Sequence, residues 1–261
     1  MLTYRADGDG PPLVLPPLVL LNGGFMTIGS WEPFMPMLTA RYRVIRCDFR
    51  GQLLSPGPYP DSLDAHAADV VELLDFLGIA TSHVLGASFG GEVAMALAAL
   101  APERVERLTV ITATERTDER MRNDAREGRG LAEEAAAGRQ EAGEELVRRV
   151  FADTWSEQWL ARQPAGFLEA RLSQLKSLPP SYFDGASAIL RILETLDLTP
   201  VLGRITASTL VLGGENDRIF PPEHSEAIAR LIPNARLEIV AGTGHGLLVE
   251  RADRVMEPLL S

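Results

Sequence analysis

A glycine–serine–glycine motif stands at the boundary between two kinds of sequence. Gly86-Ala87-Ser88-Phe89-Gly90 follows the strand-like run His83–Leu85 and precedes an alanine-rich run with helical spacing. A serine in a sharp turn between a strand and a helix needs small neighbours two residues away on either side, and such a turn exposes its hydroxyl. The motif therefore indicates nucleophilic catalysis by Ser88. The alternative is a glycine-rich turn that contains an incidental serine.

A serine hydroxyl is a weak nucleophile and needs a neighbouring base. The chain contains four histidines. His66 lies within a helix-like segment, His83 opens the strand at the wrong end from Ser88, and His224 lies near the start of a predicted helix. His245 lies between glycines, directly after a predicted strand. Because the carboxyl ends of parallel strands share one edge of a sheet, we expect His245 to be the base for Ser88.

The base in turn needs a carboxylate that orients it, on a loop between the serine and the histidine in chain order. Glu215 and Asp217 both follow the strand-like run 209–212. Asp217 is favoured, because a short carboxylate before the apolar pair Ile219-Phe220 can turn inward, whereas Glu215 would reach solvent. Glu115, just past another predicted strand, is a third candidate.

Strand-like runs alternate along the chain with stretches of helical spacing, which predicts an α/β architecture with a largely parallel sheet. The predicted strands are Leu18–Leu21, Tyr42–Cys47, His83–Leu85, Leu108–Thr112, Thr209–Leu212 and Leu237–Val240. The predicted helices are Leu63–Leu77, Gly90–Leu100, Pro222–Leu231 and Ala252–Leu260. The sequence Pro-Pro-Leu-Val-Leu occurs twice in tandem, at 11–15 and 16–20, and is interpreted as a local duplication in a hairpin loop.

The segment from 114 to 202 differs from the rest because it has no strand-like runs. It contains 16 acidic and 12 basic residues, interleaved, which is typical of solvated helices with local ion pairs. We therefore expect a core of residues 1–113 and 203–261 with a helical cap, 114–202, inserted between two strands. Three aromatic residues are candidates for the substrate pocket between them: Phe25, Trp155 and Trp159.

The composition limits the class of protein. The formal net charge of −11 disfavours a general affinity for nucleic acid or for an anionic membrane surface. The single cysteine, Cys47, excludes an internal disulfide framework and a multi-cysteine zinc site, and no pair of histidines has ligand spacing. We expect a cytoplasmic monomer or homodimer with no metal and no other cofactor. We also expect no targeting or membrane segment, because Pro16-Pro17 splits the apolar stretch near the start.

Taken together, these motifs resemble the α/β-hydrolase superfamily over nearly the whole chain. The resemblance rests on Asn22-Gly23-Gly24, on Asp48-Phe49-Arg50-Gly51, on the turn at Ser88, on Asp217 and on His245, in this order. It implies an α/β-hydrolase fold, a Ser88–His245–Asp217 triad and an oxyanion hole. The two oxyanion donors would be the backbone N–H groups of Phe89 and Gly24, with Phe25 close behind.

Two departures from the common pattern concern the loops around the site. Asn22-Gly23 stands where many members carry His-Gly, which looks like the branch that contains enol-lactonases. The stretch Arg50-Gly51-Gln52-Leu53-Leu54-Ser55 stands where many show Arg-Gly-x-Gly-x-Ser, so that loop is expected to have its own shape.

The expected function is hydrolysis of a small or medium carboxylic ester or lactone through an acyl-enzyme. A serine at the turn argues against the dehalogenases and epoxide hydrolases of the superfamily, which use an aspartate there. Three alternatives stay open: a carbon–carbon bond hydrolase, an acyltransferase with the same triad, and a small-molecule receptor without catalysis.

Overall fold

The described residues fold around one sheet of seven strands. The computed structural model describes residues 2–7, 15–52, 55, 57–175 and 178–260. The strands lie in the order β1-β3-β2-β4-β5-β6-β7. β1 is antiparallel to β3, and all other neighbouring pairs are parallel. Their bounds are β1 (Tyr4–Asp7), β2 (Pro17–Leu21), β3 (Arg43–Cys47), β4 (Ser82–Ala87), β5 (Val105–Ile111), β6 (Ser208–Gly214) and β7 (Ala235–Val240).

The predicted α/β architecture is confirmed, since six of these strands overlap the six predicted ones. β1 has no counterpart among the predicted strands, because Tyr-Arg-Ala-Asp carries no apolar run and is defined only by its pairing with β3. The second copy of the tandem repeat leads into β2, whereas the first copy lies almost entirely outside the described residues.

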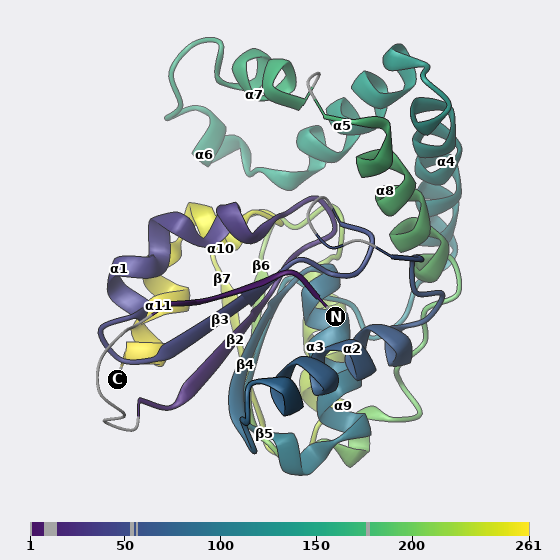
Figure 1. Cartoon of the computed structure of the whole chain (residues 1–261). Helices are drawn as coiled ribbons and strands as arrows, with labels where there is room; N and C mark the ends of the chain where they lie inside the picture. Colours follow the sequence, from purple (N-terminus) through teal and green to yellow (C-terminus); the bar gives the residue numbers. More distant parts are fainter. Residues whose placement is uncertain (1, 8–14, 53–54, 56, 176–177, 261) are drawn as a thin grey trace.

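Helices cover both faces of the sheet (Figure 1). One face packs against α2 (Leu63–Phe76), α3 (Phe89–Leu100) and α9 (Pro222–Leu231). The other packs against α1 (Met35–Leu38), α10 (Leu247–Glu250) and α11 (Ala252–Leu260). Short 3-10 turns are η1 (Ile28–Phe34), η2 (Pro102–Arg104) and η3 (Leu202–Arg204). Within the described ranges, no helix combines the length and the apolar character that a membrane span requires.

Helix α2 illustrates how local sequence sets an element. Its N-cap, Ser62, accepts a hydrogen bond from the Ala65 N–H, which satisfies one of the free donors of the first turn. Val70 and Leu74 are fully buried against the sheet, as their helical spacing predicts. The helix ends just before Gly78, whose φ of +66° is a conformation that glycine adopts without strain.

In the described part of the segment between β5 and β6 there are five helices, and in Figure 1 they lie above the carboxyl ends of the strands. They are α4 (Glu119–Ala136), α5 (Gln140–Thr154), α6 (Glu157–Leu160), α7 (Phe167–Leu175) and α8 (Pro180–Leu193). The chain enters and leaves this insertion side by side. The Thr117 N–H donates to the Leu196 carbonyl at 3.0 Å, and the Leu198 N–H donates to the Glu115 carbonyl at 2.7 Å. The division into a core and a cap at 114–202 stays our prediction.

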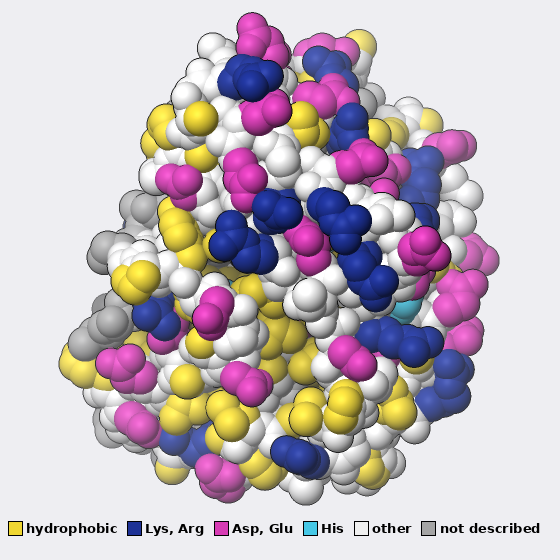
Figure 2. Space-filling model, turned by 90° about the vertical axis from the view of Figure 1, so that its right-hand side faces the viewer, with side chains coloured by type: hydrophobic (Ala, Val, Ile, Leu, Met, Phe, Trp, Pro, Cys, Tyr) yellow, Lys and Arg dark blue, Asp and Glu magenta, His cyan; other side chains and the backbone are white. Residues whose placement is uncertain are grey.

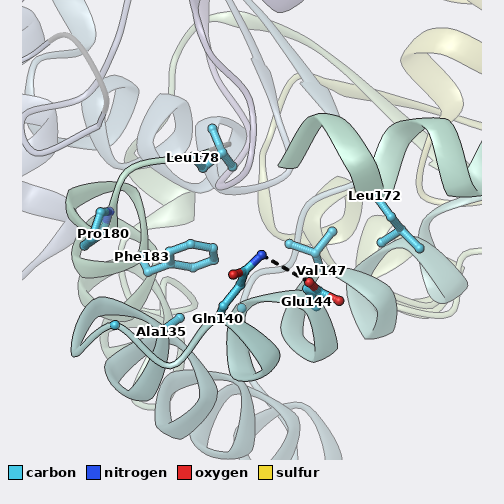
Figure 3. A pocket seen from close by; sticks show the side chains of 10 residues that line it. Ala135, Gln140, Glu144, Val147, Leu172, Leu178, Pro180 and Phe183 are labelled. Atoms are coloured by element: carbon cyan, nitrogen blue, oxygen red, sulfur yellow. Dashed lines mark hydrogen bonds between the residues drawn. The ribbon is translucent and has the colours of Figure 1, made fainter. Parts of the chain in front are cut away.

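The insertion has an apolar cluster of its own and a cavity beside it. The cluster includes Leu146 and Val147 of α5 and Tyr182 and Phe183 of α8. A cavity of about 180 Å³ opens between α4, α5 and α8, with Phe183 on one side and the Gln140–Glu144 hydrogen bond at another (Figure 3). None of its lining residues belongs to the predicted catalytic set.

The outer face of the insertion is highly charged. Figure 2, which shows the side of α4 and α8, has basic and acidic side chains interleaved over its upper part. Arg129 pairs with Glu133 at 2.7 Å, one turn along α4, and also with Glu194 beyond the end of α8. The charge pattern of α4 therefore forms local ion pairs, as the sequence indicates.

Candidate active site

Ser88 occupies a strained turn between β4 and α3. Its φ of 52° and ψ of −125° lie in a region that side chains other than glycine rarely adopt. A Cβ atom on Gly86 would lie 2.1 Å from the Gly90 carbonyl oxygen, and one on Gly90 would lie 2.2 Å from the Leu21 carbonyl oxygen. Both flanking positions therefore exclude any side chain, which is the physical reason for the motif read from the sequence.

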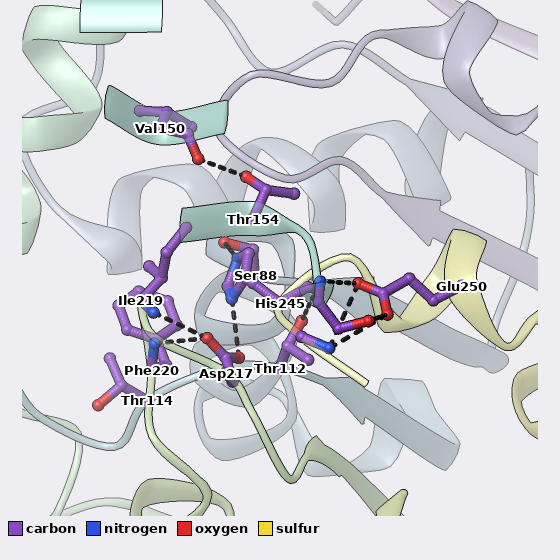
Figure 4. Close-up of polar contacts among 12 residues, drawn as sticks. Ser88, Thr112, Thr114, Val150, Thr154, Asp217, Ile219, Phe220, His245 and Glu250 are labelled. Atoms are coloured by element: carbon purple, nitrogen blue, oxygen red, sulfur yellow. Dashed lines mark hydrogen bonds and ion pairs between the residues drawn. The ribbon is translucent and has the colours of Figure 1, made fainter. Parts of the chain in front are cut away.

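Ser88, His245 and Asp217 meet at the carboxyl edge of the sheet (Figure 4). The distance from His245 Nε2 to Ser88 Oγ is 2.9 Å, and that from His245 Nδ1 to Asp217 Oδ2 is also 2.9 Å. The three side chains come from the loops after β4, β7 and β6. Thr112, at the end of β5, donates its hydroxyl to the His245 carbonyl at 3.2 Å.

The Asp217 carboxylate is held in one orientation. Its side chain is fully buried. Oδ1 accepts the backbone N–H groups of Ile219 and Phe220, each at 2.9 Å, which leaves Oδ2 for His245. The ring of Phe220 packs edge-on against the His245 ring at 5.3 Å between centroids. These contacts hold the imidazole ring with Nε2 facing Ser88 and Nδ1 facing Asp217.

The two other candidate acids have different partners. Glu215 is exposed and accepts the Gly242 N–H at 2.8 Å. It therefore binds the backbone of the His245 loop, and no described contact joins it to the imidazole ring. Glu115 is buried and lies 2.9 Å from His224 Nδ1. The geometry therefore favours Asp217, the residue that the sequence predicts.

The remaining histidines lie away from the Ser88 hydroxyl. His66 packs edge-on against the rings of Phe49 and Phe89, at 5.1 and 5.2 Å between centroids. Burial, aided by the charge of Arg50, lowers the pKa of His66 to about 4, so it is neutral near pH 7. His83 packs against Tyr42 at the opposite end of β4.

The predicted oxyanion donors lie on adjoining segments. Phe89 is the first residue of α3, so its N–H has no acceptor in the helix, and no acceptor for it or for the Gly24 N–H occurs in the described part of the chain. A Cβ on Gly24 would lie 4.0 Å from the Phe89 Cβ. Both N–H groups are therefore available beside Ser88, and their role as oxyanion donors stays our prediction.

A buried polar network anchors the loop that carries Gly24. Asn22 donates from Nδ2 to Asp48 Oδ1 at 2.9 Å and accepts the indole N–H of Trp31 at 2.7 Å. Asp48 Oδ1 also accepts the Ile28 N–H at 2.8 Å. Asn22 therefore holds this loop in place through buried hydrogen bonds.

Gln52 was not among the residues predicted to form the site, yet it braces the same loop. It is buried, its Oε1 accepts the Phe49 N–H at 3.0 Å, and its Nε2 donates to the carbonyls of Gly23 and Gly24 at 3.5 and 3.4 Å. No motif in the sequence pointed to Gln52, which stands at a variable position of the common pattern, and Leu53 and Leu54 of that stretch lie outside the described residues.

The candidate pocket residues lie where the insertion meets the core. Tyr182 of α8 donates its hydroxyl to the Phe25 carbonyl at 3.4 Å. Trp155 and Trp159 stack at 4.4 Å between centroids. Because a Cβ on Gly246 would lie 2.5 Å from the Trp155 ring, Trp155 packs on the loop of His245. The roles of Phe25, Trp155 and Trp159 in binding substrate stay predictions.

No cluster of metal-ligating side chains accompanies this site. Within the described residues, no group of three or more histidine, cysteine, aspartate or glutamate side chains is arranged to hold a metal ion. Cys47 is buried in β3, and burial raises the pKa of its thiol to about 12. Cys47 therefore stays protonated and unreactive near neutral pH.

The fold and the turn at Ser88 define a known class. A family model described as alpha/beta hydrolase fold matches residues 16–252, and the chain belongs to this family. A protein of Caulobacter segnis named carbamate hydrolase RutD is 28% identical over 271 residues, with 100% of this chain and 98% of that protein covered. Pimeloyl-(acyl-carrier protein) methyl ester esterase of Photobacterium profundum is 31% identical over 271 residues, with 99% and 96% covered.

The solved structures agree with this assignment. The enol-lactonase from Burkholderia xenovorans superposes with a TM-score of 0.82 at 25% identity, covering 99% of this chain and 95% of the enol-lactonase. The predicted resemblance to the superfamily is confirmed. Family membership and these relatives place the chain among the hydrolases.

Proposed function

We propose that the chain is a serine hydrolase that cleaves carboxylic esters or lactones with Ser88, His245 and Asp217. The observation that carries this proposal is the unbroken series of polar contacts from the Ser88 hydroxyl through both His245 nitrogens to a buried carboxylate, each at 2.9 Å. The relatives named a methyl ester esterase and an enol-lactonase support it, because their names refer to an ester and to a lactone.

The proposed reaction has two halves. Ser88 Oγ attacks the carbonyl carbon while His245 Nε2 takes its proton, and Asp217 stabilises the imidazolium through Nδ1–H. The N–H groups of Phe89 and Gly24 bind the oxyanion of the tetrahedral intermediate. The intermediate collapses, His245 protonates the leaving alkoxide, and an acyl ester remains on Ser88. Water that gives its proton to His245 then attacks this ester, and as the acyl–Oγ bond breaks His245 returns the proton to Ser88 Oγ and the carboxylic acid leaves.

The proposed substrate is a small molecule that enters between the core and the cap. The cap helices lie above the edge of the sheet that carries Ser88 (Figure 1). Phe25, next to Gly24, and Trp155 of the cap are the proposed apolar contacts of the substrate; Phe25 packs near Tyr182 and Trp155 packs near Phe151. A carbamate, as in the name of the Caulobacter relative, has a carbonyl group open to the same attack.

The proposal is tested by replacing Ser88 with alanine. Ser82→Ala is the matched control, because Ser82 is a buried serine at the other end of the same strand. We expect Ser88→Ala to lower kcat on aryl esters by about 10³-fold or more and to abolish fluorophosphonate labelling. Ser82→Ala should keep both. A folded Ser88→Ala variant with the hydrolysis rate of the wild type would refute the proposal.

A substrate panel separates the alternatives. Aryl esters of graded acyl length and simple lactones should be turned over faster than vinylogous diketones, the substrates of a carbon–carbon bond hydrolase. An added alcohol should not divert most of the acyl group, as it would in an acyltransferase. Labelling that stops at one equivalent of ester without turnover would favour a receptor.

A further inference from the structure

A short stretch of the insertion, residues 152–156, lies directly against both loops that orient the base (Figure 4). The N–H of Gly246, next to His245, donates to the Thr154 carbonyl at 2.7 Å. Arg218, next to Asp217, donates from Nη2 to the Ala152 carbonyl at 2.9 Å. We call residues 152–156 the docking segment.

The glycines beside His245 are explained by this contact. A Cβ on Gly244 would lie 2.8 Å from the Ser156 backbone nitrogen, and one on Gly246 would lie 2.5 Å from the Trp155 ring. Neither glycine is among the described residues with positive φ, whereas Gly242 is. Close approach of the docking segment, rather than an unusual backbone conformation, therefore requires glycine at 244 and 246.

One carboxylate joins the loop to the docking segment. Glu250, the last residue of α10, accepts the Gly244 N–H at 3.3 Å, the Ser156 N–H at 2.9 Å and the Ser156 hydroxyl at 2.5 Å. Ser156 is buried. Hydrogen bonds to an ionised carboxylate are about twice as strong as neutral ones, so Glu250 holds three donors from two segments at one point.

We propose that Glu250 is a positioning residue for His245, acting through Gly244 and the docking segment. The inference rests on the proposed function, since it concerns the base of that reaction. Glu250 touches neither the ring of His245 nor Ser88 in any described contact, so its effect is on the position of the loop. A misplacement of about 1 Å in a catalytic group can lower the rate about 10²-fold.

The test compares graded variants of this joint with a control in the same insertion. Glu250→Ala removes all three acceptor contacts, Glu250→Gln keeps one acceptor oxygen, and Ser156→Ala removes only the hydroxyl. Glu194→Gln is the control, because Glu194 binds Arg129 between cap helices and contacts neither triad loop. The measured quantities are kcat and KM on a short aryl ester, with active sites counted by fluorophosphonate titration.

We expect kcat per titrated site to fall about 10- to 100-fold in Glu250→Ala, less in Glu250→Gln and least in Ser156→Ala. KM should stay within about twofold in all of them, because none of these groups touches the ester. Glu194→Gln should keep the kcat of the wild type. If Glu250 serves only stability, kcat per titrated site will equal that of the wild type in every variant, which would overturn the inference.

A second readout does not depend on turnover. The proton between His245 Nδ1 and Asp217 should give a downfield proton resonance in the wild type and in Glu194→Gln, and the resonance should broaden or vanish in Glu250→Ala. Persistence of that signal in Glu250→Ala would also overturn the inference. Failure of the proposed function looks different: the wild type would then neither hydrolyse esters nor react with the fluorophosphonate, whatever the variants do.

Discussion

The neutral histidine beneath Phe89 should make the stability of this protein depend on pH in a specific window. His66 is almost fully buried, and Nδ1 has no hydrogen-bond partner among the described residues. Its pKa in the folded chain is about 4, against an ordinary value of 6.5, because burial disfavours the imidazolium and Arg50 adds a smaller repulsion. Replacing His66 by phenylalanine keeps an aromatic ring against Phe49 and Phe89 and removes the titration.

The sign and size follow from proton linkage. Between pH 6.5 and about pH 4 the unfolded chain binds a proton at His66 and the folded chain does not, so the free energy of unfolding falls as the pH falls. The contribution of neutral His66 to the free energy of unfolding is fully present well above pH 6.5. At pH 4 the loss amounts to about 3 kcal/mol, from 1.36 kcal/mol for each unit between the two pKa values. His66→Phe should not lose this amount.

Urea unfolding followed by tryptophan fluorescence at pH 7.5, 6, 5 and 4 measures the effect as the difference between His66→Phe and the wild type. That difference should grow by about 3 kcal/mol in favour of the variant as the pH falls to 4. Phe49→Leu is the control, since it disturbs the same aromatic cluster and keeps His66. A difference that stays constant with pH would show that His66 titrates normally in the folded chain.

Two further predictions concern carboxylates. Asp217→Asn should lower kcat/KM for an aryl ester about 10⁴-fold, because the amide cannot hold the tautomer of His245 in the same way. Glu215→Gln, the control, should lower kcat/KM less than about tenfold. Equal losses of kcat/KM would refute the assignment of the acid. Glu92 is fully buried, and burial raises its pKa well above the ordinary value of 4.5. The free energy of unfolding of the wild type therefore falls as the pH rises above 4.5, because the unfolded chain releases the proton that the folded chain keeps. Glu92→Gln has no such proton and should not show this loss. Thermal unfolding from pH 5 to 9 should show a gap in Tm that widens with pH in favour of Glu92→Gln, and a gap independent of pH would contradict this.

The part of the site that was predictable rests on strong local constraints. The turn at Ser88 excludes side chains at Gly86 and Gly90, so the turn can be predicted from residues that are adjacent in the sequence. The choice of Asp217 over Glu215 followed from the apolar residues after it, whose N–H groups bind Oδ1. The order of strands and motifs in an α/β chain then brings the three loops to one edge.

The rest depends on contacts between distant segments that carry no local signal. β1 exists only through its pairing with β3, and Glu115 pairs with a histidine 109 positions away. Gln52 stands at a variable position of the common pattern, and its acceptors on the Gly23–Gly24 loop are set by the fold. Glu250 likewise gave no sign in the sequence, because its partners, Gly244 and Ser156, meet only after the insertion has docked.

The paired entry and exit of the insertion have an evolutionary consequence. Arg116 and Asp197 form an antiparallel bridge at its base, so the ends of a stretch of some eighty residues are already neighbours in space. A helical segment of another length would therefore join the core at the same two points, because this bridge fixes where the insertion begins and ends. Exchange of the helices beyond this bridge would have to preserve the contact that the loop of His245 makes with the Thr154 carbonyl.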